Sequence, residues 1–258
     1  MTDGQKAEVR RQFGGSPEDY VKSAGHASGP DLEQLMAWGR KRGAARVLDI
    51  ATGGGHTALG FAGFSPTVVA TDLTLPMLRA ARAFILGRGG SNVRFLAADV
   101  DALPFKDESF GVVTCRIAAH HFPELLPALR QVARVLRPGG SFLAQDILGH
   151  DDSELAGFIL EVEKRRDPSH VRSFRRLEWI AFLRASGLTV IDEATVTKER
   201  VWEEWTGRTR MSPEAKADLE DFVRRAPARC REAFDFRIDS GRIQSFTDRM
   251  LLLRADKD

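Results

Sequence analysis

The chain has 258 residues, of which 43% are hydrophobic and 29% charged, and its formal net charge is +2. These values fit one large globular domain and give no reason to expect a nucleic acid as partner. Its cysteines, Cys115 and Cys230, lie far apart and match neither a disulfide framework nor a zinc site. The first thirty residues lack an apolar run of signal-peptide length, and no stretch is long enough to span a membrane. We therefore expect a cytoplasmic protein.

Short apolar runs alternate with helical patterns along most of the chain. The expected strands are 46–50, 67–71, 92–97, 110–115, 141–145, 188–196 and 245–254. The expected helices are 30–42, 56–62, 74–83, 125–136, 151–166, 177–185 and 202–226. Strands that alternate with helices predict an α/β fold, in which a parallel sheet carries helices on both faces.

The chain is expected to divide into three parts of one domain. Residues 1–43 would form an arm and a helix that could act as a lid, with residues 1–16 as a frayed arm. Residues 44–150 would form the ligand-binding core. Residues 151–258 would complete the sheet and cover the acceptor side with helices.

Three successive predicted strands end in acidic residues or an acidic glycine loop. Asp49–Gly55 follows the first strand, Asp72 ends the second and Asp99 ends the third. Because ligands bind at the carboxyl ends of parallel strands, Asp72 could accept hydrogen bonds from ribose hydroxyls, and Asp99 could accept from the adenine amine. Asp49 would repel a pyrophosphate but attract a sulfonium or an amine, and the loop lacks the lysine of a P-loop. The pattern favours S-adenosylmethionine (SAM) over NAD, although each feature alone also fits a tight turn or a helix start.

Several segments together resemble the class I SAM-dependent methyltransferases, in the small-molecule branch typified by UbiE and YcgJ. They are Val47-Leu-Asp-Ile-Ala-Thr-Gly-Gly-Gly-His-Thr-Ala58, Thr71-Asp-Leu-Thr-Leu-Pro-Met-Leu78, Ala98-Asp-Val-Asp-Ala-Leu-Pro-Phe105, residues 109–122 and residues 135–140. Residues 166–172 resemble a segment of the YcgJ-like branch, and the match runs from about residue 44 to 190. The resemblance implies a Rossmann-like, mostly parallel sheet of seven strands whose last strand is antiparallel.

The resemblance also implies which residues hold the cofactor. Asp49, Ala51, Gly53 and Gly55 would line the methionine half of SAM, Asp72 and Leu73 the ribose and adenine edge, Asp99 and Val100 the adenine, and Arg116 and Ile117 the amino-acid end. The sequence departs from the family at Ala51, where the family has a glycine, and this methyl group could narrow the space beside the cofactor. The product would be S-adenosylhomocysteine (SAH), and no metal is required.

Candidate residues for the acceptor side follow the fourth strand. His121 could act as a general base or orient the acceptor, because histidine titrates near neutrality, whereas local packing explains His120 more simply. Tyr20 and His26 would lie over the cofactor if the N-terminal segment forms a lid, and on a loose surface segment if it does not.

A basic segment, residues 164–176, contains His170 and Arg172 and could recognise an acidic group of the acceptor. A solvated helix end is the alternative for this segment. Four aromatic residues could line an acceptor pocket or simply belong to the core: Trp179, Phe182, Trp202 and Trp205. A covalent role for Cys115 is excluded because it falls inside a predicted strand.

The sequence thus predicts transfer of a methyl group from SAM to an O, C or N atom of a small molecule. One alternative is a SAM-binding sensor or subunit without transferase activity, which would keep Asp49 to Asp99 but lack an open acceptor pocket. An NAD-dependent oxidoreductase is opposed by Asp99. No basic domain or tail argues for RNA or protein methylation. The acceptor stays undetermined, as does the choice between a monomer and a homodimer.

Overall fold

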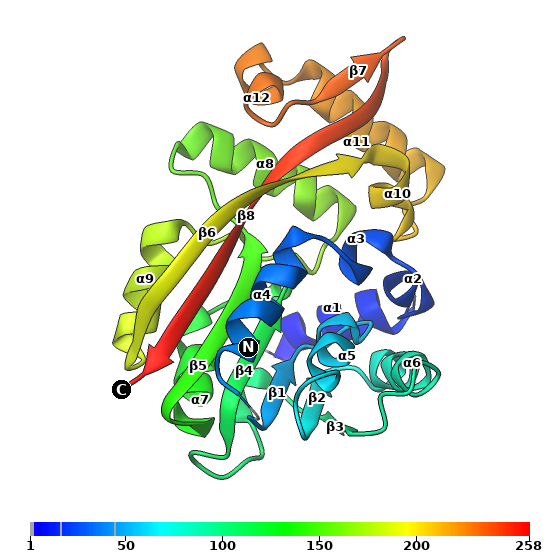
Figure 1. Cartoon of the computed structure of the whole chain (residues 1–258). Coiled ribbons are helices and arrows are strands. Elements are labelled where there is room, and N and C mark those ends of the chain that lie inside the picture. The colour runs from blue at the N-terminus through cyan, green and yellow to red at the C-terminus, as the bar shows by residue number, and fades with distance from the viewer. Residues whose placement is uncertain (1–2, 16, 44) are drawn as a thin grey trace.

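A twisted β-sheet forms the centre of the computed structural model, which describes residues 3–15, 17–43 and 45–258 (Figure 1). Seven strands follow the order β3-β2-β1-β4-β5-β8-β6, and β7 pairs with β8. The strands are β1 (Val47–Ile50), β2 (Val68–Asp72), β3 (Val93–Ala97), β4 (Phe110–Arg116), β5 (Leu136–Ile147), β6 (Leu188–Val201), β7 (Arg237–Asp239) and β8 (Arg242–Lys257). Neighbours among β1 to β5 pair in parallel, whereas β8 is antiparallel to β5 and β6. The predicted Rossmann-like sheet is confirmed, with the short β7 as an addition.

Helices cover both faces of the sheet because alternate residues of the inner strands point to opposite sides and both sets are apolar. Val47 and Val112 pack with α4 and α5, whereas Leu48 and Val113 pack with α7 and α9. The helices are α1 (Asp3–Gly14), α2 (Pro17–Val21), α3 (Ala24–Ala27), α4 (Pro30–Arg40), α5 (His56–Ala62), α6 (Leu75–Leu86), α7 (Leu125–Val135), α8 (Ser153–Arg166), α9 (Arg176–Ala185), α10 (Trp202–Gly207), α11 (Pro213–Arg225) and α12 (Ala228–Ala233). Two single 3-10 turns, η1 (Val100–Ala102) and η2 (Ala119–His121), follow β3 and β4.

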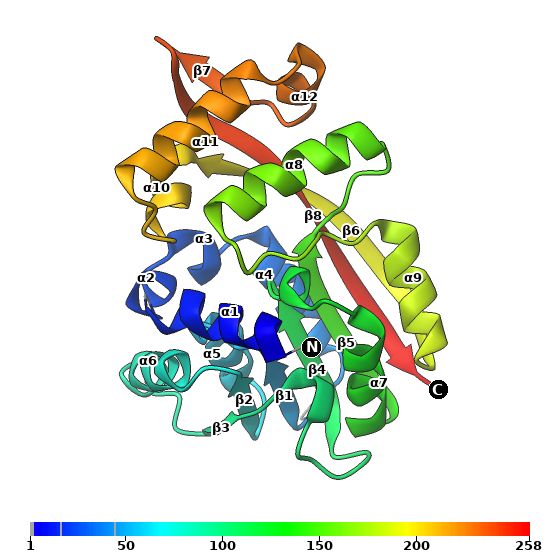
Figure 2. The same ribbon diagram turned by 180° about the vertical axis from the view of Figure 1, so that it is seen from behind.

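A third apolar cluster lies beyond the sheet core, where β6 and β8 extend outward (Figures 1 and 2). It joins α8, α10, α11 and α12 to the first part of β8, and we call these elements with β7 the cap. Trp202 and Phe246 are fully buried at its centre. The expected single helix over 202–226 is interrupted, because Ser212 Oγ accepts a hydrogen bond from the Ala215 N–H at 3.2 Å and begins a new helix.

The expectation of a frayed arm over residues 1–16 is wrong for the described part of that segment. The helix α1 occupies Asp3–Gly14 and lies at the sheet edge where β1 and β4 end (Figure 2). Contacts distant in sequence hold it: Val9 is buried, and the Phe13 ring packs edge-on against His121 at 4.9 Å. Tertiary packing thus stabilises a helix whose own periodicity is weak. Within the described residues, no helix is long and apolar enough to cross a membrane.

Candidate active site

A cavity opens at the carboxyl ends of the central strands, and the loop after β1 forms one wall of it. Gly53 and Gly55 have φ angles of 53° and 85°, which glycine adopts without steric cost. Ala51 and Ile117 also have positive φ angles, 50° and 54°, and both line the cavity. A left-handed conformation costs about 1–2 kcal/mol for residues with a Cβ. The positive φ angle at Ala51 explains why the family has a glycine at this position. This chain therefore carries backbone strain after β1, at Ala51, and after β4, at Ile117.

Asp72 ties two strand ends together at the cavity wall. Its carboxylate accepts hydrogen bonds from the Gly53 N–H at 3.0 Å and from the Thr74 N–H and hydroxyl, both at 2.9 Å. Burial raises the pKa of Asp72, and these hydrogen bonds oppose the rise. Leu73 and Val100 line the cavity beside it. An apolar wall with one carboxylate at the end of β2 fits an adenosyl group.

Asp49 lies behind the cavity wall and is fully enclosed. Its carboxylate accepts hydrogen bonds from the hydroxyls of Thr114, at 2.5 Å, and Thr52, at 2.6 Å. Burial, the largest effect, raises the pKa of Asp49 to about 6. A cationic sulfonium or amine in the nearby loop would favour the charged carboxylate. Gly55, at the N-terminus of α5, is likewise outside the cavity lining.

Protonation of Asp49 predicts a specific pH dependence of stability. The folded protein holds this proton more tightly than the unfolded chain, because the pKa rises from 3.8 to about 6. Its stabilising contribution is complete below pH 3.8 and is lost as the pH rises through about 6. The loss amounts to about 2–3 kcal/mol of the free energy of unfolding. Urea denaturation at pH values from below 3.8 to above 6 should show the free energy of unfolding falling with pH in the wild type. The fall should be absent in Asp49→Asn.

The matched control is Asp107→Asn, because the Asp107 side chain is 74% exposed. It should keep the wild-type slope. An Asp49→Asn variant with the same slope as the wild type would assign the pH dependence to other groups.

The other predicted cofactor residues are held by ion pairs. Asp99 pairs with Lys6 of α1 and accepts a hydrogen bond from the Asp101 N–H at 3.0 Å, and its side chain is not part of the cavity lining. Arg116 lines the cavity and donates to Asp31 of α4 at 2.9 Å and to Gln145 at 2.7 Å. Arg116 is therefore fixed in place by a buried carboxylate and an amide.

The N-terminal helices close the cavity from outside. Val9 and Phe13 of α1 and Tyr20 of α2 line it. The backbone of Tyr20 lies so close to the glycine loop that a Cβ on Gly54 would come within 2.9 Å of its carbonyl oxygen. His26 lies in α3, but its side chain is outside the described part of the structure. The structure thus places Tyr20 beside the glycine loop. It describes no contact of the His26 side chain.

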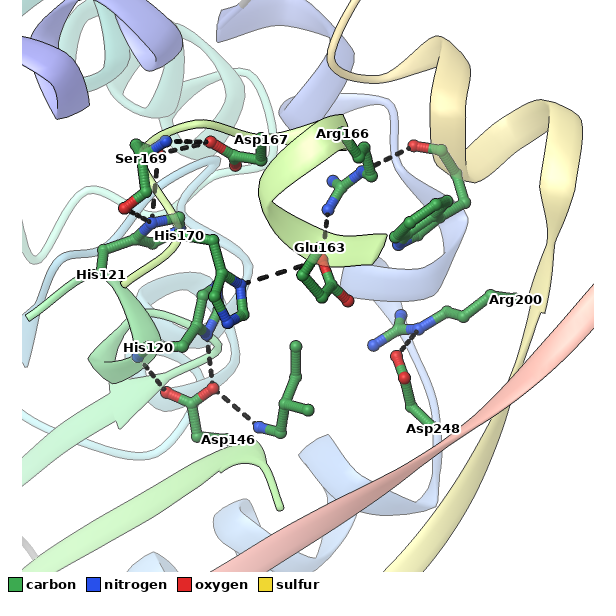
Figure 3. Close-up of polar contacts among 12 residues, drawn as sticks. His120, His121, Asp146, Glu163, Arg166, Asp167, Ser169, His170, Arg200 and Asp248 are labelled. Atoms are coloured by element: carbon green, nitrogen blue, oxygen red, sulfur yellow. Dashed lines mark hydrogen bonds and ion pairs between the residues drawn. The ribbon is translucent and has the colours of Figure 1, made fainter. Parts of the chain in front are cut away.

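His120 forms a buried pair with Asp146, the residue near the end of β5 (Figure 3). The His120 Nδ1–H donates to Asp146 Oδ1 at 2.6 Å, and Asp146 also accepts from the backbone N–H groups of His120 and Ile147. Burial opposes the charged imidazole, but the charge and hydrogen bond of Asp146 outweigh it and raise the pKa of His120. The His120 ring lines the cavity, and its Nε2 makes no hydrogen bond with any described residue. This geometry suits a general base.

His121 occupies a different environment. Its Nδ1–H donates to the Ser169 carbonyl at 3.0 Å, which leaves Nε2 as the acceptor nitrogen. Burial, followed by the charge of His120, lowers the pKa of His121 to about 4. His121 therefore stays neutral at physiological pH and is a weaker base than His120. This ranking reverses the one expected from the sequence.

The two remaining acceptor-side candidates do not form the cavity lining. His170 is buried and stacks on His120, with ring centroids 4.8 Å apart. Arg172 pairs with Glu178 at 2.8 Å, and its guanidinium lies over the Phe174 ring. His170 thus supports the histidine pair from behind, and Arg172 is engaged elsewhere.

Five charged cavity residues were not expected as site residues from the sequence: Glu163, Arg166, Asp167, Arg200 and Arg208. Arg166 and Asp167 lie in the basic segment, residues 164–176, and the charge of that segment is the sequence signal that pointed to them. Among the four aromatic residues, Trp205 lines the cavity, whereas Trp179 and Trp202 are core residues and Phe182 packs against the core. Cys115 is buried inside β4.

Comparisons with known proteins show the family to which this chain belongs. Residues 48–144 match a family model described as a methyltransferase domain. YcgJ of Bacillus subtilis (strain 168), described as an uncharacterized methyltransferase, is 33% identical over 95% of this chain and 97% of its own length. The ubiquinone/menaquinone biosynthesis C-methyltransferase UbiE of Azotobacter vinelandii is 42% identical, over 38% of this chain and 40% of that protein.

Solved structures of similar proteins share the fold over most of the chain. The crystal structure of YcgJ from Bacillus subtilis has a TM-score of 0.84 at 33% identity and covers 88% of this chain and 97% of its own. A Bacillus halodurans C-125 structure, described as that of a candidate methyltransferase, has a TM-score of 0.85 at 38% identity and covers 89% and 99%.

Proposed function

Because this chain belongs to the methyltransferase family that includes YcgJ, we propose that it transfers the methyl group of SAM to a small-molecule acceptor. One observation carries the proposal: the same cavity is lined by the glycine loop with Asp72 and by His120, which is paired with Asp146. The first group suits an adenosyl cofactor, and the second suits removal of a proton from an acceptor.

The residues proposed to hold SAM are Ala51, Gly53, Asp72, Leu73, Val100 and Arg116, with Asp49, Gly55 and Asp99 behind or beside them. Bound SAM supplies an electrophilic methyl group on a sulfonium. An acceptor O, C or N atom would take this methyl group, so that its bond to the methyl carbon would form as the carbon–sulfur bond broke and SAH would be released. Where that atom carries a proton, His120 Nε2 accepts it, and Asp146 stabilises the resulting imidazolium.

The same proposal gives each part of the chain a task. Residues 1–43 act as a lid, supported by the lining contacts of Phe13 and Tyr20. Residues 44–150 bind the cofactor. Residues 151–258 complete the sheet and cover the acceptor, and they belong to the same domain because β8 pairs with both β5 and β6.

Calorimetric titration of the purified protein with SAM, SAH and NAD tests this function. We expect both adenosyl ligands to bind and NAD not to bind. Binding of NAD alone, or of no ligand, would contradict the proposal. A screen of small-molecule acceptors with radiolabelled SAM then identifies the methylated compound.

Substitution of the two strand-end carboxylates tests the cofactor residues. Asp72→Ala is expected to weaken SAM binding by about 1–3 kcal/mol, the range for losing a hydrogen bond to a charged group. Asp99→Ala should have a smaller effect, because Asp99 pairs with Lys6 and its side chain is not part of the cavity lining. Calorimetric titration measures the change, and Asp107→Ala on the exposed surface is the control. Unchanged affinity in both variants would show that these carboxylates do not contact SAM.

A further inference from the structure

Three arginines meet at the part of the cavity that faces the cap. Arg166 ends α8, Arg200 lies on β6 and Arg208 follows α10, and all three line the cavity. Figure 3 shows Arg166 and Arg200 on either side of Glu163. Segments far apart in the sequence thus place three guanidinium groups around one space.

Fixed partners orient two of these arginines. Arg166 donates from Nη1 to Glu163 at 3.2 Å and from Nε to the Trp205 carbonyl at 3.1 Å, and its guanidinium lies over the Trp205 ring. Arg200 donates from Nε to Asp248 at 2.7 Å. Within the described residues, Arg166 Nη2 and Arg200 Nη1 have no hydrogen-bond acceptor. Both arginines therefore keep one donor nitrogen available while their positions are set by neighbours.

Arg208 differs because no described carboxylate lies within ion-pair distance of it. Its hydrogen bond among the described residues runs from Nη1 to Ser23 Oγ at 3.1 Å, and its Nε is buried without a partner. Burial, followed by the charges of Arg166 and Arg200, lowers the pKa of Arg208 to about 10. A buried cation without a counter-ion is costly, so an anion that enters here would be stabilised.

The nearby cavity carboxylates have partners other than Arg208. Glu163 Oε2 pairs with Arg166, whereas Glu163 Oε1 is buried without a hydrogen-bond partner among the described residues. Asp167 accepts hydrogen bonds from the Ser169 hydroxyl, at 2.5 Å, and N–H, at 3.0 Å. No described acidic side chain therefore neutralises Arg208 directly.

We propose that Arg208, together with Arg166 and Arg200, binds a carboxylate or phosphate group of the acceptor. A guanidinium presents two parallel N–H donors that match the oxygens of either group. The inference rests on the proposed methyltransferase function and adds the chemical class of its substrate: an acid, with the methylated atom placed toward His120.

Anion binding to the SAH-saturated protein tests this site. The probes are inorganic phosphate and benzoate, each titrated calorimetrically against sodium chloride at equal ionic strength, since salt alone screens charge. The proteins are wild type, Arg208→Gln, Arg208→Lys and Arg225→Gln. Arg225 is the matched control because its side chain is 80% exposed on α11. Circular dichroism confirms that each variant folds.

We expect one or both probes to bind the wild type, and whichever binds tightly identifies the group. Arg208→Gln should weaken that binding by about tenfold or more, the loss of a charge-assisted hydrogen bond, and Arg225→Gln should not change it. Arg208→Lys keeps the positive charge but loses the paired N–H donors of the guanidinium, so its affinity for the anion should lie between those of the wild type and Arg208→Gln. If Arg208→Gln does not fold, the comparison of Arg208→Lys with wild type decides.

Two results would overturn the inference. Equal anion binding in wild type and the Arg208 variants, including no binding in any, would show that these arginines do not form an anion site. Loss of SAH affinity in the Arg208 variants would assign the arginines to the cofactor's carboxylate. Failure of SAH to bind the wild type is a separate outcome, because it contradicts the proposed function itself.

Discussion

His120→Gln is expected to lower the turnover number by about 10²–10⁴-fold, the usual contribution of a general base. The reason is the geometry: Asp146 fixes the His120 ring through Nδ1, so that Nε2 carries the lone pair at the cavity. SAH affinity should stay near the wild-type value, because the cofactor loop is untouched. Steady-state kinetics with the acceptor found in the screen, together with calorimetry of SAH, measures both quantities.

His121→Gln is the matched comparison, since His121 is adjacent in sequence and also buried. Its turnover should fall far less, because its pKa near 4 makes it a weak base. Turnover of His120→Gln within twofold of the wild type, or a larger loss in His121→Gln, would reject His120 as the base.

The pH profile of turnover has a predicted direction. The neutral imidazole is the active form, so turnover should rise with pH and level off above the pKa of His120, which lies above the ordinary 6.5. Asp146→Asn removes the charge that raises this pKa, and the profile should shift to lower pH while the plateau falls. An unshifted profile in Asp146→Asn would mean that another group titrates. NMR titration of the histidine side chains measures the same pKa directly.

Phe246→Ala is expected to lower the free energy of unfolding by about 3–5 kcal/mol, the range for truncating a buried aromatic residue. Phe246 is fully buried, stacks on Phe236 with ring centroids 5.0 Å apart, and meets Trp205 edge-on at 4.8 Å. Trp205 in turn supports Arg166 at the cavity. The variant should therefore weaken both the cap and the packing that positions Arg166 at the cavity. Urea denaturation, followed by circular dichroism and tryptophan fluorescence, gives the change.

The same experiment tests whether the cap and the core are one domain. Coincident transitions by the two probes are expected, because β8 runs through both parts. Separate transitions would show that the cap unfolds independently. Leu177→Ala is the control, since Leu177 is 68% exposed and its truncation should change the stability by less than about 0.5 kcal/mol.

The strand ends that line the cavity could be predicted from the sequence because their signals are local. Each strand and the polar residue at its end are contiguous, as with β2 and Asp72, and parallel pairing brings those ends to one edge. The burial of Asp49 was not predicted. Its charge suggested direct contact with a ligand, whereas in the structure its carboxylate is buried and hydrogen-bonded to Thr52 and Thr114.

The part of the cavity that faces the cap was predicted only in outline because distant segments build it. Arg200 and Arg208 carry no motif and reach the cavity through the course of β6 and α10. The sequence analysis favoured His121 over His120, whereas the structure pairs His120 with Asp146. Asp146 directly follows the strand expected over 141–145, and in the structure the pairing of Arg116 with Gln145 places Asp146 next to His120.

The course of the chain through β6 and β8 has a consequence for protein evolution and engineering. Val201 and Ser245 are paired neighbours in these two strands, and everything between them, including α10 and α11, leaves and rejoins the sheet at one point. Recombination that replaces this excursion keeps both chain ends in register. A new segment at the positions of Trp205 and Arg208 could thus be grafted onto the sheet without moving Gly53 or Asp72, while Arg166 and Arg200 stay in place. The part of the cavity that faces the cap can therefore change while the residues at the strand ends stay the same.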